Sequence, residues 1–92
     1  MSQPIELHAV VSGTIQGVGF RFKAQKIAER LQITGYVQNL PNGGVEIVAQ
    51  GPRHILDDFI INLKNLSLPV QIKDLQVTWK KPQKEWQIFH IH

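Results

Sequence analysis

Hydrophobic and polar positions in the first third of the chain change from a two-residue spacing to a helical one. Alternate residues from Ile5 to Val11 are apolar, which is the period of a β-strand. From Phe20 to Leu31 the apolar residues recur at helical spacing, with lysine, glutamate and arginine on the other side. The pattern predicts a strand that is followed closely by an amphipathic helix.

The middle of the chain has the pattern of a β-hairpin over residues 34–50. TGYVQNL and VEIVAQ have the composition of strands, and Pro41-Asn42-Gly43-Gly44 separates them. These four residues are typical of a tight turn, in which glycine supplies the positive φ. We therefore expect the two strands to pair with each other.

A second helix and two further strands are predicted after the hairpin. Pro52 suits the first turn of a helix, and an apolar stripe continues to Leu63 before the segment SLP ends it. VQIKDLQVTW, residues 70–79, predicts a strand or a bulged strand, because its apolar residues do not share one strict alternation. A turn at residues 80–84 then leads to WQIFHIH, a short final strand.

The predicted order is strand, helix, strand, strand, helix, strand, with a short fifth strand. This order predicts an α+β fold, the ferredoxin-like βαββαβ sandwich, in which two helices cover one face of a mostly antiparallel sheet. The chain has 92 residues and no linker or repeat, so we expect a single domain over residues 1–92. That fold hosts many unrelated functions, so function has to be argued from particular residues.

Composition narrows the class of protein. The chain has 42% hydrophobic and 18% charged residues, no cysteine and a formal net charge of +3, so it has no disulfides and no cysteine-based metal site. The positive charge is mild, and it falls short of the footprint of a nucleic-acid-binding protein. The N-terminal segment lacks a secretion signal, and no apolar run approaches the ~20 residues of a membrane span. We therefore expect a soluble, cytoplasmic protein with no nucleic-acid or membrane partner.

The segment GTIQGVGFR, from Gly13 to Arg21, lies where the first strand gives way to the first helix. A loop that enters a helix exposes unpaired N–H groups, and the helix dipole adds partial positive charge. Gly17 and Gly19 let these N–H groups converge on one anion, and Arg21 adds a planar cationic group suited to phosphate oxygens. The segment is therefore either a loop that binds phosphate or carboxylate, or a tight connection whose arginine faces water.

Asn39 favours the first interpretation. Asparagine is depleted in strands, yet Asn39 lies within GYVQNL, where it would otherwise only help to open the turn at Pro41. The right-handed crossover rule makes the first two strands parallel, so their C-terminal ends lie at the same edge of the sheet. We therefore expect Asn39 to be a spatial neighbour of the loop 16–21.

Both segments resemble known signatures. GTIQGVGFR is similar to the phosphate-binding signature of the acylphosphatase family, and GYVQNLPNGGVEIVAQG is similar to that family's second signature. The matching residues of the second segment are Gly35, Tyr36, Asn39, Gly43, Val45 and Gly51. The chain departs from the pattern at Ile15, where valine is usual, and at Thr14, where a basic residue is common. The second change is expected to weaken the attraction for an anionic substrate without altering the central site.

The resemblance implies an enzyme that hydrolyses acyl phosphates to a carboxylate and inorganic phosphate. It implies that Asn39 orients the attacking water, and that Arg21 and the main-chain N–H groups of the loop hold the phosphoryl oxygens. The loop residues are Gln16, Gly17, Val18, Gly19, Phe20 and Arg21. Phosphoryl transfer is chiefly positioning and charge stabilisation, so a neutral amide suffices to hold water in line. We therefore expect attack on phosphorus with no metal, no cofactor and no phosphoenzyme, by a monomer whose partner is a small acyl phosphate.

Three alternatives rest on other patterns. His8, His90 and His92 suggest metal ligands, although no cysteine or carboxylate cluster accompanies them and a strand end also explains the last two. RNA-binding RRM domains share the element order, and VGFRF echoes their RNP1 motif, but VEIVAQ, the strand that would carry it, has no aromatic residue. Acylphosphatase-like domains also occur within larger proteins that handle carbamoyl phosphate, where the domain would keep the loop but not this reaction.

Overall fold

The computed structural model describes residues 3–92 and contains the two helices and five strands that the sequence predicts. The elements, in chain order, are β1 (Ile5–Thr14), α1 (Phe20–Arg30), β2 (Thr34–Asn39), β3 (Val45–Gly51), α2 (Arg53–Lys64), β4 (Gln71–Lys80) and β5 (Phe89–Ile91). Their order and arrangement confirm the α+β, ferredoxin-like sandwich.

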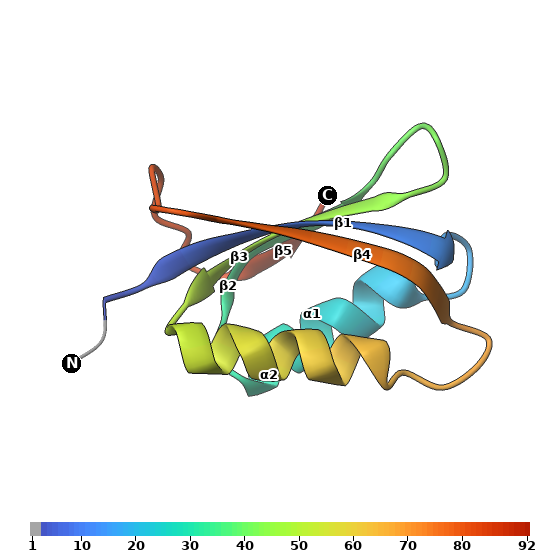
Figure 1. Ribbon diagram of the computed structural model, residues 1–92, viewed down its shortest axis with the longest axis horizontal. Coiled ribbons are helices and arrows are strands. Elements are labelled where there is room, and N and C mark those ends of the chain that lie inside the picture. The colour runs from blue at the N-terminus through green and yellow to red at the C-terminus, as the bar shows by residue number, and fades with distance from the viewer. Residues whose placement is uncertain (1–2) are drawn as a thin grey trace.

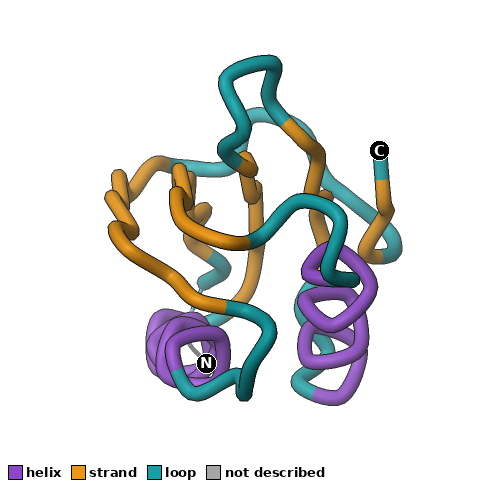
Figure 2. The backbone as a smooth tube through the Cα atoms, turned by 90° about the vertical axis from the view of Figure 1, so that its right-hand side faces the viewer, coloured by secondary structure: helices purple, strands orange, loops and turns teal. Residues whose placement is uncertain are grey.

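The strands form one five-stranded sheet in the order β4-β1-β3-β2-β5. β1 pairs antiparallel with β3 and β4, β2 pairs antiparallel with β3, and β5 runs parallel to β2. Both helices cover the same face of this sheet, as Figures 1 and 2 show from two directions. Because β1 and β2 are each antiparallel to β3, they are parallel to each other, and their C-terminal ends lie at the same edge of the sheet.

The hydrophobic core fills the space between the sheet and the two helices. Its buried members are Leu7, Ala9, Val11, Ile15, Phe20, Ala24, Ile27, Ala28, Ile33, Val37, Val45, Ile47, Ala49, Leu56, Phe59, Leu63, Val70 and Phe89. Full burial of one large apolar side chain contributes about 1.5–3 kcal/mol, so this shared core stabilises two helices that are too short to persist alone in water. Within residues 3–92, neither helix has the length and apolar character that crossing a membrane would require.

The C-terminal third shows where the sequence pattern was right and where it was wrong. The strand predicted within residues 70–79 is confirmed, and of the two forms left open it is the bulged one, because the pairing of β4 with β1 shifts at Lys73. The final strand is shorter than predicted and begins at Phe89 instead of Trp86. The reason is that the main-chain N–H of Trp86 donates to the side chain of Gln50, and not to a neighbouring strand.

Candidate active site

The loop between β1 and α1 curls through two glycines in the left-handed region of backbone space. φ is 79° at Gly17 and 78° at Gly19, a conformation that costs residues with a Cβ roughly 1–2 kcal/mol. Gly19 is also the N-cap of α1, and no side chain caps the helix there. The loop is therefore shaped by the backbone alone, and the helix N-terminus is left open.

The main-chain N–H groups of this loop have no partner in the part of the chain that the structure describes. Within residues 3–92, no hydrogen bond involves the N–H groups of residues 16–19. The first helical bond of α1 runs from Lys23 N to Gly19 O at 3.0 Å, so the N–H groups of the first turn also lack helical acceptors. Unpaired N–H groups at the positive end of a helix dipole favour an anion.

A pocket of about 200 Å³ lies beside this loop. It is lined by Ile15, Gly17, Gly19, Phe20, Arg21, Phe22, Asn39 and Ile91. The structure thus brings Asn39, Arg21 and much of the loop to one cavity, as the parallel arrangement of β1 and β2 requires. Gln16 and Val18, the other residues predicted for the phosphate site, do not line the pocket: Val18 packs against the core, and the side chain of Gln16 turns toward the hairpin.

The charge of the pocket suits an anion. Among residues 3–92, the only charged residue that lines it is Arg21, and no carboxylate does. Nη1 of Arg21 donates to the main-chain oxygen of His92 at 2.9 Å, and the N–H of His92 donates to the carbonyl of Val37 at 2.8 Å. A guanidinium carries five N–H donors, so this anchor orients Arg21 and leaves other donors for a ligand.

The two C-terminal histidines belong to an aromatic cluster on β2 and β5. The ring of His92 stacks on Tyr36, with the ring centroids 4.6 Å apart and the planes 7° from parallel, and the His90 ring lies 5.8 Å from that of His92. His8 lies elsewhere and makes a 2.6 Å hydrogen bond to Glu6. In residues 3–92 there is no group of three histidine, cysteine, aspartate or glutamate side chains that could hold a metal ion.

Four features of the site were missed from the sequence. Phe22 and Ile91 line the pocket although 51% and 39% of their surfaces are exposed, which makes its rim apolar. The third feature is the main-chain oxygen of His92 on Arg21, and the fourth is the side chain of Gln16 on the hairpin. For Ile91 a signal existed, because a parallel pairing of β5 with β2 brings the ends of both strands to the edge where Asn39 lies.

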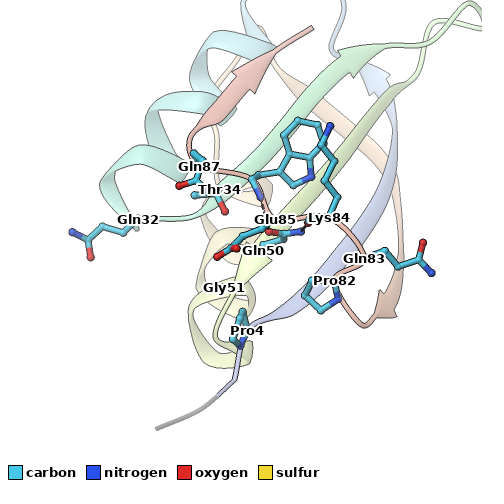
Figure 3. A pocket seen from close by; sticks show the side chains of 11 residues that line it. Pro4, Gln32, Thr34, Gln50, Gly51, Pro82, Gln83, Lys84, Glu85 and Gln87 are labelled. Carbon is cyan, nitrogen blue, oxygen red and sulfur yellow. Dashed lines mark hydrogen bonds between the residues drawn. The ribbon is translucent and has the colours of Figure 1, made fainter.

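A second and larger pocket, of about 570 Å³, lies at the opposite end of the sheet (Figure 3). Gln50 is among its lining residues, and the side chain of Gln50 is already bonded to Glu6, to the carbonyl of Lys84 and to the N–H of Trp86. Neither Arg21, nor Asn39, nor the glycine loop contributes to it. The larger pocket therefore lacks the residues that the sequence predicts for the phosphate site.

The RNA-binding alternative fails on the position of VGFRF. Phe20 is the first residue of α1 and is 1% exposed, whereas RNP1 aromatics lie on a strand with their rings free to stack on bases. β3, the strand that corresponds in order, carries no aromatic residue.

Comparison with known proteins gives a consistent result. A family model described as acylphosphatase matches residues 7–91. The acylphosphatase of Methanospirillum hungatei is 45% identical over 73 residues, which cover 78% of this chain and 80% of that protein. The crystal structure of acylphosphatase from Bacillus subtilis superposes with a TM-score of 0.91 at 34% identity, covering 96% of this chain and 98% of that one.

A larger protein also contains a similar unit. The crystal structure of full-length HypF in the phosphate- and nucleotide-bound form matches with a TM-score of 0.86 and 28% identity. That match covers 100% of this chain but only 12% of the HypF chain. The similarity in length is therefore with the small proteins, which match over most of their own length.

Proposed function

The chain belongs to the acylphosphatase family and hydrolyses acyl phosphates, and from this premise we propose that Arg21, Asn39 and the main-chain N–H groups of residues 16–21 carry the reaction. The observation that supports this assignment is the single pocket that Arg21 and Asn39 share with the glycine loop. The remaining steps follow from the chemistry of the groups in that pocket.

The phosphoryl group of the substrate occupies the loop. Its oxygens accept hydrogen bonds from the unpaired N–H groups and from the guanidinium of Arg21, whose bond to His92 holds it at the rim. These donors are already oriented before the reaction, so they stabilise charge on the equatorial oxygens of the transition state without reorganising. The loop and Arg21 thus supply binding and charge stabilisation together.

Asn39 orients the water. Its amide offers both an acceptor and a donor, and it lines the same pocket as the loop. The water oxygen bonds to phosphorus while the bond from phosphorus to the acyl oxygen breaks, and the carboxylate leaves with the electron pair. A proton of the water passes to a phosphoryl oxygen, so the products are a carboxylate and inorganic phosphate. No metal, cofactor or phosphoenzyme takes part.

We propose further that residues 1–92 act as one catalytic domain, as a monomer and in the cytoplasm. One core supports the first point, because all seven elements contribute to it, β4 through partly buried side chains. Sedimentation of the purified protein and fractionation of cells test the other two.

Isotope transfer tests the mechanism directly. Hydrolysis of benzoyl phosphate in ¹⁸O-labelled water should place the label in inorganic phosphate, because water attacks phosphorus; label in benzoate would show attack on the acyl carbon and contradict the proposal. The rate should be unchanged by a chelator. Asn39→Ala should lower kcat by ~10²-fold or more while the inhibition constant of inorganic phosphate changes much less. A protein that binds phosphate but does not turn over would be a binding module instead.

A further inference from the structure

The side chain of Gln16 joins the two halves of the active site. We propose that Gln16 is a positioning residue, which holds Asn39 at the correct distance from the phosphate loop. This inference rests on the proposed role of Asn39 and adds a side chain that acts on the reaction without touching the substrate. It concerns the side chain of Gln16, whereas the phosphate site uses only its main chain.

The geometry of the contact is specific. Nε2 of Gln16 donates to the carbonyl of Leu40 and to the carbonyl of Gly44, each at 2.8 Å. A glutamine amide has two N–H donors, and both are used here. The two acceptors lie at opposite ends of the β2–β3 turn, which is closed by a 2.8 Å bond from Leu40 N to Gly44 O. One side chain from the phosphate loop therefore forms hydrogen bonds to both ends of the turn.

The place of Asn39 depends on its backbone, because no hydrogen bond within residues 3–92 holds its side chain. Asn39 is exposed, and its amide makes no hydrogen bond within residues 3–92. Its position is set by the backbone at the end of β2, where it pairs with Val45 of β3. Leu40, the next residue, is one of the two that Gln16 binds. The bond from Gln16 to Leu40 thus ties the loop to the residue next to Asn39.

The reaction is sensitive to such a link. A water held in line must stay within a few tenths of an ångström of its productive position, and a misplacement of about 1 Å from a remote change costs ~10²-fold in rate. Phosphate binding depends less on the hairpin, because its donors come from the loop and Arg21. Loss of the Gln16 contact should therefore lower kcat much more than it weakens phosphate binding.

Gln16→Met tests the proposal, because methionine keeps the length of the side chain and removes both donors. A matched control is Gln50→Met, which removes a glutamine that bridges Glu6 and the carbonyl of Lys84 at the other end of the sheet. Steady-state hydrolysis of benzoyl phosphate, inhibition by inorganic phosphate and urea unfolding are measured for both, and for Gln16→Met combined with Asn39→Ala.

The proposal predicts three results together. Gln16→Met lowers kcat by about 10- to 100-fold, while the inhibition constant of phosphate changes by less than about threefold. Gln50→Met lowers the urea midpoint at least as far but leaves kcat near that of the unmodified enzyme. In the Asn39→Ala background, Gln16→Met changes kcat by less than about twofold, because the residue through which it acts is gone.

Two results would overturn it. One is a wild-type kcat for Gln16→Met, and the other is an equal fractional loss of kcat with and without Asn39. Both leave the proposed function intact provided that Asn39→Ala alone is impaired. An Asn39→Ala enzyme with wild-type kcat would overturn the role of Asn39 and this inference together, so the two failures are distinguishable.

Discussion

Replacing Arg21 with alanine separates the chemical role of the guanidinium from its structural one. The substitution removes the charged side chain of the pocket and its 2.9 Å hydrogen bond to the main-chain oxygen of His92. It leaves the backbone of the loop, both glycines and the core unchanged.

The two consequences differ in size. Loss of one hydrogen bond at an exposed site costs about 0.5–1.5 kcal/mol of stability, which is small beside the roughly 5–15 kcal/mol that stabilises a domain. Loss of one donor to transition-state charge costs ~10²–10³ in rate, or about 2.7–4 kcal/mol. A guanidinium offers more than one donor and a full charge, so the rate should fall by at least this factor while the protein stays folded. Arg21→Lys keeps the charge but not the planar guanidinium, so its rate should lie between those of the wild type and Arg21→Ala.

The assay is the hydrolysis of benzoyl phosphate, followed alongside urea unfolding. Arg30→Ala is a matched control, because Arg30 lies on the same helix and makes one 3.1 Å side-chain hydrogen bond, to Asn62. It should lose a similar amount of stability and none of the activity. The reasoning is refuted if Arg21→Ala retains the wild-type rate, or if Arg30→Ala loses as much activity as Arg21→Ala.

Two further predictions concern the backbone of the loop and the pH dependence of stability. An added Cβ at Gly19 meets no atom within 4 Å, so Gly19→Ala should lower the free energy of unfolding only by the cost of the left-handed backbone, about 1–2 kcal/mol. Gly19→Asn should lower it less, because asparagine tolerates that conformation. Urea unfolding in which the alanine variant is more stable than the asparagine variant would contradict this. Burial and then the hydrogen bond to Glu46 raise the pKa of Tyr36 from 10.0 to about 12. Because of this raised pKa, the folded protein keeps the Tyr36 hydroxyl proton at pH values where the unfolded chain loses it. This contribution to stability is complete below pH 10 and is lost as the pH rises toward about 12. Tyr36 is the single tyrosine, so absorbance at the tyrosinate band reports it directly, and a midpoint near 10 in the folded protein would contradict the prediction.

The spacing of apolar residues was sufficient to predict the order of helices and strands. The change of period at Phe20 located α1, because a helix with one buried face repeats every 3.6 residues and a strand every two. The broken alternation within 70–79 suggested a bulged strand, and the pairing with β1 places the bulge at Lys73. The start of β5 was misplaced at Trp86 because a local pattern contains no information about Gln50, a distant side chain that takes the N–H of Trp86.

The sequence by itself determined the order of the elements, the glycine loop and the expected proximity of Asn39 to that loop, since these follow from local spacing and from the handedness of one crossover. Only the tertiary structure decided how the site is held together. Arg21 meets His92 across 71 positions and Gln16 meets Leu40 across 24. Such contacts depend on which strand lies beside which and on the direction of β5, and each is made to a main-chain oxygen. Every residue has such an oxygen, so no residue type in the sequence marks the partner.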